Sequence, residues 1–286
     1  MFKKPLVLLQ KIVRSAQWGS FIDRLRRLIL IRRIDDTTRS VIGHIHHRIT
    51  HTGRCLFCQE VTRTSLDLCR YCIESLPRNA PACTHCGQCL PVNARISEIQ
   101  GEPVSGSPDD VLRCGACQKQ PVVVRRAFAH SRYLWPADIM VRQLKYGKKL
   151  YYGRTMGLLM ARELSHRAVL DVDVLIPIPL ADSRWRERGF NQAEEIARTL
   201  ARHTNKPLDR HLLIRHRQTG PQAGLSKKQR KRNIRGCFSC PATIAPQRYA
   251  LIDDVLTTGA TANEAARVLL AAGAQSVDIW VFARTP

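Results

Sequence analysis

Hydrophobic and polar positions alternate between two periodicities over residues 121–286. Short apolar runs rich in β-branched residues predict buried strands, and apolar residues that recur every three or four positions predict helices that pack on them. The predicted strands span residues 122–130, 172–179, 249–254 and 276–282, and the predicted helices span residues 138–146, 153–166, 193–201 and 262–270. Asn191 is a candidate N-cap of the third helix, and Gly273 is placed to end the fourth. The alternation predicts an α/β domain with a mostly parallel, Rossmann-like sheet.

Charge and cysteine content divide the chain into three predicted regions. These are a basic extension at residues 1–50, a cysteine-rich module at residues 51–120 and the α/β domain at residues 121–286. Apolar residues and arginines interleave in the first region, which predicts a basic amphipathic helix that lies on anionic lipid or binds a partner. A disordered or mistranslated leader is the alternative.

The chain is strongly basic, with 46 Lys and Arg against 23 Asp and Glu and a formal net charge of +23. This balance favours polyanionic partners such as nucleic acid, phosphorylated ligands or anionic lipid, although a solvated basic surface has the same composition. No run approaches the ~18–20 apolar residues of a membrane span. The start of the chain lacks a clear signal-peptide cleavage site. We therefore expect a cytoplasmic protein without an integral membrane span, peripheral to the inner membrane if the first region binds lipid.

Nine of the eleven cysteines lie between residues 55 and 117, mostly as Cys-x-x-Cys pairs. In the cytoplasm such pairs are more typical of metal ligands than of disulfides, and two pairs complete a tetrahedral structural Zn²⁺ site. The predicted ligands of two zinc ribbons are Cys55, Cys58, Cys69 and Cys72, and then Cys83, Cys86, Cys114 and Cys117. Cys86 with Cys89 competes as the third pair, and a redox Cys-x-x-Cys is the other interpretation. Cys237 and Cys240 lack a matching pair and are predicted to be ordinary small residues near a strand.

The strand at residues 249–254 ends in adjacent carboxylates, Asp253 and Asp254, and a small hydroxyl-rich loop leads directly into the next helix. Free N–H groups at a helix N-terminus and Thr hydroxyls make a phosphate cradle, and paired acids accept hydrogen bonds from a sugar diol. The loop residues are Thr257, Thr258, Gly259, Ala260 and Thr261. A P-loop NTPase also places an acid after a strand, but the sequence has no G-x-x-x-x-G-K-[ST] loop. The segment resembles the phosphoribosyl-diphosphate (PRPP) motif of type I phosphoribosyltransferases.

A cysteine-rich module, an α/β region and this motif, in that order, resemble the ComF family, which includes the GntX-like proteins. Further segments match the family's patterns "LKY-G", "P-x-P-L … RGFNQ" and "R-x-T-x-x-Q-x-x-L … R-x-x-N". They are residues 144–147, residues 177–180 with Arg184 and residues 188–192, and residues 217–222 with Leu225, Arg230 and Asn233. The resemblance covers residues 55–286 and leaves residues 1–54 outside it.

The resemblance implies a site for PRPP and Mg²⁺ in which Asp253 and Asp254 hold the ribose diol and residues 257–261 hold the 5′-phosphate. It assigns pyrophosphate binding to Pro177, Ile178, Pro179, Leu180, Arg184 and Arg188, and a mobile hood to a basic segment that includes Arg217, Gln222, Arg230 and Asn233. Some purine-specific relatives have Asp at the position of Thr257, so purine salvage is not implied.

Two functions follow as expectations. The first is a phosphoribosyltransferase of glycosyltransferase type that uses PRPP and acts on an acceptor that the sequence does not identify. The second is a non-catalytic accessory of DNA uptake in natural transformation, which binds single-stranded DNA or the uptake machinery. The net charge and the acid-free basic segment at residues 215–235 favour nucleic acid, whereas an aromatic content of 6% offers few obvious platforms for base stacking.

Overall fold

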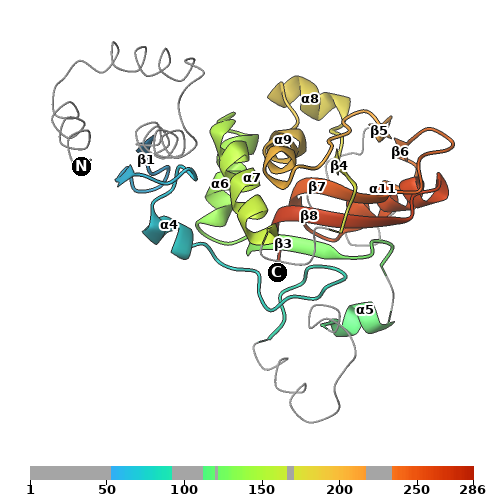
Figure 1. The fold of residues 1–286 in the computed structure, drawn as a ribbon, viewed down its shortest axis with the longest axis horizontal. Helices are drawn as coiled ribbons and strands as arrows, with labels where there is room; N and C mark the ends of the chain where they lie inside the picture. Colours follow the sequence, from blue (N-terminus) through green and yellow to red (C-terminus); the bar gives the residue numbers. More distant parts are fainter. Residues whose placement is uncertain (1–52, 92–111, 120–121, 166–170, 217–233) are drawn as a thin grey trace, which may run out of the picture. The chain divides into compact units, whose positions relative to one another are not determined.

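The computed structural model describes residues 53–91, 112–119, 122–165, 171–216 and 234–286 (Figure 1). The chain divides into two compact units between Cys69 and Arg70. In the first unit, strands β1 (Gly53–Arg54) and β2 (Val61–Thr62) pair in antiparallel fashion. The second unit, residues 70–286, holds the main sheet and the helices that pack on it.

The centre of the second unit is a four-stranded parallel sheet with the strand order β3-β8-β7-β4. The strands are β3 (Ala127–Arg132), β4 (Val174–Pro177), β7 (Arg248–Leu256) and β8 (Ser276–Arg284). The two central strands carry long apolar runs because both of their faces are covered. This confirms the predicted α/β fold. Because all four strands run in one direction, their carboxyl ends meet at one edge, where ligands bind in such sheets.

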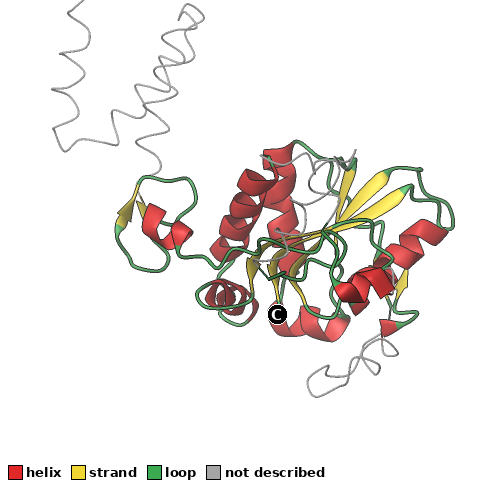
Figure 2. Ribbon diagram, turned by 90° about the horizontal axis from the view of Figure 1, so that it is seen from below, coloured by secondary structure: helices red, strands yellow, loops and turns green. Residues whose placement is uncertain are grey.

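Helices cover both faces of this sheet, as the two ribbon views show (Figures 1 and 2). Helices α7 (Tyr151–Leu164) and α9 (Gln192–Thr204) pack on the strands, and α6 (Ala137–Lys145) packs on α7. Helix α11 (Ala260–Ala271) packs on β7 and β8 together with strand β6 (Phe238–Ser239), which pairs with β5 (Ile214–Arg215). Three short helices complete the described chain: α4 (Arg70–Glu74), α5 (Gly115–Lys119) and α8 (Asp182–Arg188).

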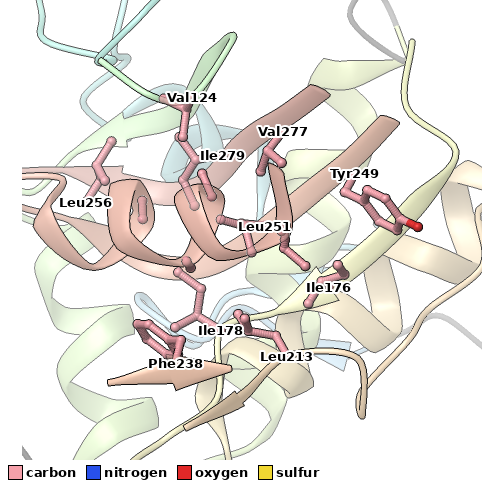
Figure 3. Close-up of a cluster of buried hydrophobic side chains, with 14 of the residues drawn as sticks. Val124, Ile176, Ile178, Leu213, Phe238, Tyr249, Leu251, Leu256, Val277 and Ile279 are labelled. Atoms are coloured by element: carbon pink, nitrogen blue, oxygen red, sulfur yellow. The ribbon is translucent and has the colours of Figure 1, made fainter. Parts of the chain in front are cut away.

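A buried apolar cluster fixes the strand that carries the two acids (Figure 3). Tyr249 and Leu251 of β7 meet Ile279 of β8 and Leu269 of α11, and each is at most 3% exposed. The cluster extends to Leu256 at the end of β7. Burying an aliphatic or aromatic side chain of this size contributes roughly 1.5–3 kcal/mol. Packing alone therefore holds the carboxyl end of β7 in place, without a ligand.

Close contact between α7 and α9 depends on glycine. A Cβ atom at Gly157 would lie 2.7 Å from the carbonyl oxygen of Ile196 and 2.8 Å from Cβ of Thr199. A Cβ atom at Gly153 would lie 2.9 Å from Cβ of Glu195. The two helices could not approach so closely with larger residues at these positions.

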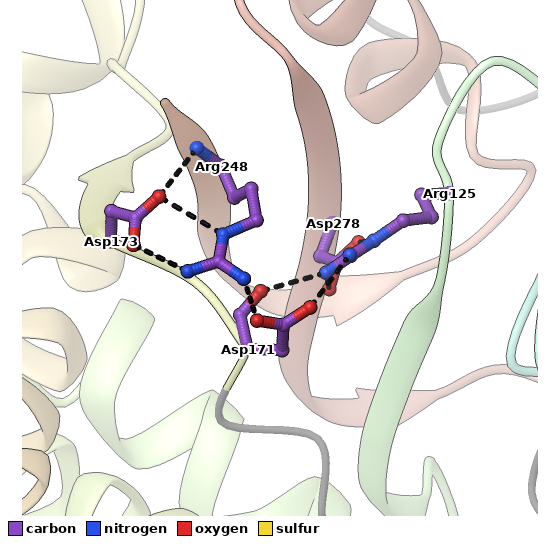
Figure 4. Close-up of polar contacts among 5 residues, drawn as sticks. All are labelled: Arg125, Asp171, Asp173, Arg248 and Asp278. Atoms are coloured by element: carbon purple, nitrogen blue, oxygen red, sulfur yellow. Dashed lines mark hydrogen bonds and ion pairs between the residues drawn. The ribbon is translucent and has the colours of Figure 1, made fainter. Parts of the chain in front are cut away.

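The amino ends of the strands are tied together by ion pairs (Figure 4). Arg125 forms two hydrogen bonds of 2.8 Å with Asp278, whose side chain is fully buried. Arg248 pairs with Asp173 at 2.8 Å, and both arginines pair with Asp171. Bidentate arginine–carboxylate pairs of this kind fix geometry as well as charge. This network lies at the end of the sheet opposite to the two acids of β7.

The structure agrees with most of the predicted elements and shifts others. The Asn191 side chain accepts a hydrogen bond from the Ala193 N–H at 3.0 Å, which confirms the predicted N-cap, and Gly273 follows α11 with a φ of 112°. The first strand was predicted at residues 122–130 but spans Ala127–Arg132. The strand starts later than predicted: the Val123 N–H donates to the Asn263 side chain, and hydrogen bonds to β8 begin at Arg125, whose N–H donates to the Val277 carbonyl at 2.8 Å.

Candidate phosphoribosyl site

Two carboxylates lie side by side near the carboxyl end of β7. Asp254 is 2% exposed, and Asp253 is half-buried. The Asp254 N–H donates to Asp253 Oδ1 at 2.8 Å, and the Val255 N–H donates to Asp254 Oδ1 at 2.9 Å. Both acids therefore use one oxygen to fix the local backbone, which sets their orientation at the ligand-binding edge of the sheet.

Lys145, the last residue of α6, approaches the buried acid from the neighbouring helix. Its Nζ lies 2.7 Å from Asp254 Oδ2, and its side chain is 20% exposed. Burial alone would lower the pKa of Lys145, but the charges of Asp254 and Asp253 outweigh it and raise that pKa. The lysine is therefore held in its charged form. In the sequence, Lys145 lies within a segment that matches the family pattern, and nothing local to it indicates a role.

The two acids are too close to ionise independently. Burial and the neighbouring charge of Asp254 raise the pKa of Asp253 to about 8, although Lys145 acts in the opposite direction. Two adjacent carboxylates with one cation commonly hold a proton between them near neutral pH. A ligand that needs both acids ionised would therefore release a proton when it binds.

The predicted phosphate loop joins β7 to the amino end of α11. Gly259 caps that helix with a φ of 74°, a left-handed conformation that glycine adopts at little cost. Its carbonyl oxygen accepts hydrogen bonds from the Asn263 backbone at 2.8 Å and from the Asn263 side chain at 2.9 Å. The Ala260 N–H points to the Thr258 hydroxyl at 3.4 Å. The loop thus places Thr hydroxyls at the positive end of a twelve-residue helix, an arrangement suited to an anion.

The predicted pyrophosphate segment follows β4, the neighbour of β7. Pro177 is the last residue of β4, and the Ile178 N–H donates to the Ile252 carbonyl at 2.9 Å. The Ile178 carbonyl in turn accepts a hydrogen bond from Asn191 at 3.1 Å, so the turn through Pro179 and Leu180 is anchored at its start.

The two predicted pyrophosphate arginines have different surroundings. Arg188 is 8% exposed, donates to Gln192 Oε1 at 2.9 Å and lies 5.6 Å from the ring centre of Tyr146. Its charge acts on Lys145, so it lies within electrostatic range of the acid pair. Arg184 forms an exposed ion pair with Glu187 at 2.6 Å on α8.

The four residues predicted for the mobile hood, Arg217, Gln222, Arg230 and Asn233, lie outside the described residues. Arg215, which precedes that segment on β5, is described. Burial lowers the pKa of Arg215 below its ordinary value, although the charges of Cys237 and Asp253 act in the opposite direction. This guanidinium therefore also lies within electrostatic range of the acid pair. Its guanidinium carbon lies 5.5 Å from the ring centre of Phe238. Sequence reasoning counted Arg215 only as one basic residue among several.

The eight predicted metal ligands form two groups. The sulfur atoms of Cys55, Cys58, Cys69 and Cys72 lie within 4.8 Å of one another, as do those of Cys83, Cys86, Cys114 and Cys117. In each group one sulfur pair is 3.6 Å apart. A tetrahedral ion with bonds of about 2.3 Å separates its sulfur ligands by about 3.8 Å, so both groups have the size for one metal ion.

The other cysteines lie outside these groups, and in each group the surroundings favour ionisation of one thiol. The Cys89 sulfur donates only weakly to the Leu90 carbonyl, at 3.8 Å, which leaves Cys86 as the partner of Cys83. A hydrogen bond from Cys86 lowers the pKa of Cys83 to about 4. Burial opposes ionisation of Cys55, but hydrogen bonds from the Cys58 and Cys69 backbone lower its pKa to about 6. Thiolates of this kind are the form that binds metal.

Exposed aromatic and cationic side chains lie on the α6–α7 connection and on α8, close in sequence to Lys145 and Arg188. We call this set the aromatic rim, and it comprises Tyr146, Lys148, Lys149, Tyr151, Trp185 and Arg186. Tyr146 is 66% exposed and Trp185 is 48% exposed. Tyr146 contacts Arg188 through its ring, and the charge of Lys148 helps to lower the pKa of Glu187. These interactions join the α6–α7 connection to α8.

A phosphoribosyltransferase-like α/β fold with Cys₄ groups toward its amino end is thus the class of protein that these observations define. The DNA utilization protein YhgH of Escherichia coli is 31% identical over 178 residues, covering 61% of this chain and 78% of the relative. Competence protein F of Haemophilus influenzae is also 31% identical over 178 residues, covering 60% and 78%. Competence protein ComFC of Bacillus subtilis is 39% identical over 115 residues, covering 39% and 45%. No family model matches the chain. With these relatives and the two cysteine groups, the chain belongs to the ComF family.

Among the described helices, none combines the length and the apolar character needed to cross a bilayer.

Proposed function

We propose that this chain binds PRPP together with Mg²⁺ and acts as a phosphoribosyltransferase. The observation that carries the proposal is the meeting of the Asp253–Asp254 pair with the Gly259-capped start of α11 at one edge of the parallel sheet. The acids suit a ribose diol, and the loop at residues 257–261 suits a 5′-phosphate two carbon atoms away along the sugar. Arg188 and Lys145 supply the positive charge that a diphosphate requires.

The reaction would be a substitution at ribose C1. An acceptor nucleophile forms a bond to C1 while the C1–O bond to pyrophosphate breaks, and pyrophosphate leaves with the electron pair. Positive charge develops on the sugar, and Asp253 and Asp254 are placed to stabilise it. Mg²⁺, a cation that prefers oxygen ligands and keeps several waters, would neutralise the diphosphate, and Asp253 and Asp254 would supply carboxylate oxygens for it. Lys145 holds the Asp254 side chain in place for this role.

The two cysteine groups are proposed to hold structural Zn²⁺. Four thiolates at tetrahedral spacing, with no fifth protein ligand in either group among the described residues, favour a closed site without an open coordination position.

The test is the thermal stability of the purified chain against PRPP, with and without Mg²⁺. A ligand that binds the folded state raises the unfolding midpoint by mass action. We expect a Mg²⁺-dependent shift for wild type and none for an Asp253→Asn/Asp254→Asn double variant. Ribose 5-phosphate serves as the control ligand that lacks the diphosphate. Zinc-loaded, folded protein that shows no shift with PRPP would overturn the proposal.

A second candidate function is single-strand binding during DNA uptake, as the names of the relatives suggest. The aromatic rim favours it, because exposed rings beside cations are the usual platform for stacked bases. We expect Trp185→Ala and Tyr146→Ala to weaken binding of an oligothymidine, with affinity that falls as salt rises. Tyr71→Ala, which removes an exposed ring (86%) on α4, is the matched control. If all three variants bind the oligothymidine with the affinity of wild type, the rim is not the DNA surface.

A further inference from the structure

The second cysteine group makes direct contact with the sheet that carries the acids. The Ala127 N–H at the start of β3 donates to the Thr84 carbonyl at 2.7 Å, and the Asn79 side chain donates to the Gly87 carbonyl at 2.9 Å. Thr84 lies within the Cys83–Cys86 turn, and Gly87 follows it directly. This turn is therefore built into the larger unit and does not stand apart from it.

Arg284 connects the same turn to the end of β7. It is the last residue of β8 and is only 9% exposed. Its Nε donates to the Cys86 carbonyl at 3.1 Å, and its Nη1 donates to the Leu256 carbonyl at 3.2 Å. The Thr285 N–H donates to the same Leu256 carbonyl at 3.1 Å. Leu256 is the last residue of β7 and immediately precedes the loop at residues 257–261.

Packing follows the same route. Gly87 has a φ of 66°, and a Cβ atom there would lie 3.8 Å from Cδ of Arg284, 3.8 Å from Cδ2 of Leu256 and 3.7 Å from Cβ of Ala127. The backbone of the cysteine turn thus rests on the side chains of both linking residues. A movement of this turn would therefore displace Leu256, both through van der Waals contact and through the hydrogen bonds of Arg284.

The metal would fix the position of this turn. Cys83 and Cys86 are two of the four sulfur ligands of the second group, so an ion bound there would hold in place the backbone that Arg284 and Leu256 contact.

We propose that the second cysteine group, when it holds its metal, positions the phosphate loop through Arg284, so that metal loss weakens ligand binding at residues 257–261. This inference rests on the proposed PRPP site for its ligand but not for its structural link. Arg284 is a positioning residue here, since it contacts the carbonyl of Leu256 and not the ligand. The first cysteine group offers a natural control, because it is not part of this route.

The test is hydrogen exchange across residues 254–264 in the full chain, measured by mass spectrometry with and without a zinc chelator. To remove the contribution of the first group, Cys55→Ser is used as the parent protein, so that chelation acts on the second group alone. We expect chelation to raise exchange in this segment and to weaken Mg²⁺-dependent PRPP binding by about fivefold or more, the usual lower range of coupling between sites. Cys55→Ser before chelation is the reference state for both measurements.

Arg284→Lys separates a link from general destabilisation, because it keeps the charge but removes the two-pronged contact. In the metal-loaded state it should raise exchange at residues 254–264 with unchanged zinc content. Chelation should then have a smaller additional effect than in the parent. Equal effects of chelation in parent and variant would overturn the proposal, as would unchanged loop exchange after chelation of the parent. If Arg284→Lys fails to fold, the chelation experiment on the parent still decides.

Failure of the proposed function gives a different result. If chelation changes exchange in the loop but the chain never binds PRPP, the link through Arg284 is supported and PRPP is not the ligand.

Discussion

Lys145 Nζ lies 2.7 Å from Asp254 Oδ2, an ion pair between the end of α6 and the end of β7. Both side chains are largely buried, at 20% and 3% exposed. A buried pair of this kind contributes little net stability compared with apolar residues, yet loss of one partner is costly because the other charge stays buried. A change at Lys145 should therefore affect Asp254 of the site, even if no ligand contacts the lysine.

Lys145→Met tests this dependence. The variant keeps the length of the side chain but leaves Asp254 without its cation, and we expect a loss of about 3–5 kcal/mol in the free energy of unfolding at pH 8. Lys149→Met, at an exposed position in the α6–α7 connection, should change it by less than about 0.5 kcal/mol. Urea denaturation of both variants and wild type gives the comparison. Equal stability of the two variants would mean that the ion pair is not formed.

The raised pKa of Asp253 predicts how stability varies with pH. In the unfolded chain this carboxyl has its ordinary pKa of 3.8, and in the folded chain the pKa is about 8. Between these values the folded state holds a proton that the unfolded state releases. The stability contributed by this group is therefore present at low pH and decreases as pH rises toward 8, by at most about 1.4 kcal/mol per pH unit.

Asp253→Asn removes this titration while it keeps the shape of the side chain. We expect the difference in unfolding free energy between the variant and wild type to grow in favour of the variant from pH 5 to pH 8, and to level off above pH 9. Denaturant unfolding at these pH values measures it. A difference that is constant across the series would show that Asp253 ionises with an ordinary pKa.

Sequence periodicity was sufficient to predict the helices and strands but not the contacts between them. The strand that carries Asp253, the Asn191 cap and the glycine after α11 follow from local rules of burial, capping and backbone conformation, and the structure agrees with them, although β7 continues to Leu256. Lys145 and Arg284 were not assigned because their roles depend on partners far away in the chain, Asp254 for one and the carbonyls of Cys86 and Leu256 for the other. A backbone acceptor leaves no residue-specific signal in a sequence.

The helix α8 shows a second limit. Its seven residues follow the Pro177–Leu180 turn and are mostly charged and exposed, so no apolar stripe marks them. The single buried position, Arg188, is charged: its Nη1 donates to Gln192 and its guanidinium lies over the ring of Tyr146, whereas its Nε has no hydrogen-bond partner among the described residues. Hydrophobic patterning cannot detect a helix whose buried side chain is an arginine.

The assignment of Cys86 to the second cysteine group predicts a difference between two neighbouring cysteines. Cys86→Ser should lower bound zinc from two equivalents per chain to one, because the group loses a ligand, whereas Cys89→Ser should keep both. Metal content by mass spectrometry after dialysis measures this directly. Loss of one equivalent in Cys89→Ser with retention in Cys86→Ser would reverse the assignment of the third cysteine pair.

Gly157 should not tolerate a methyl group. Alanine favours a helix interior over glycine by about 1 kcal/mol, so propensity alone predicts that Gly157→Ala stabilises α7. Its Cβ, however, would lie 2.7 Å from the carbonyl oxygen of Ile196, a backbone atom that cannot rotate away. Overpacking of this kind costs about 1–3 kcal/mol and requires α7 and α9 to separate, which outweighs the gain in propensity.

Gly115→Ala is the matched control, since Gly115 begins α5 and a Cβ atom there would meet nothing within 4 Å. We expect Gly157→Ala to lower the unfolding midpoint and Gly115→Ala to leave it unchanged or raise it slightly, as measured by scanning calorimetry on zinc-loaded protein. Because α9 also packs on β7, the strand of the acid pair, separation of the helices should reach the site, and Mg²⁺-dependent PRPP binding should weaken in the first variant only. A stabilised Gly157→Ala protein would mean that α7 and α9 are farther apart in solution than this packing requires.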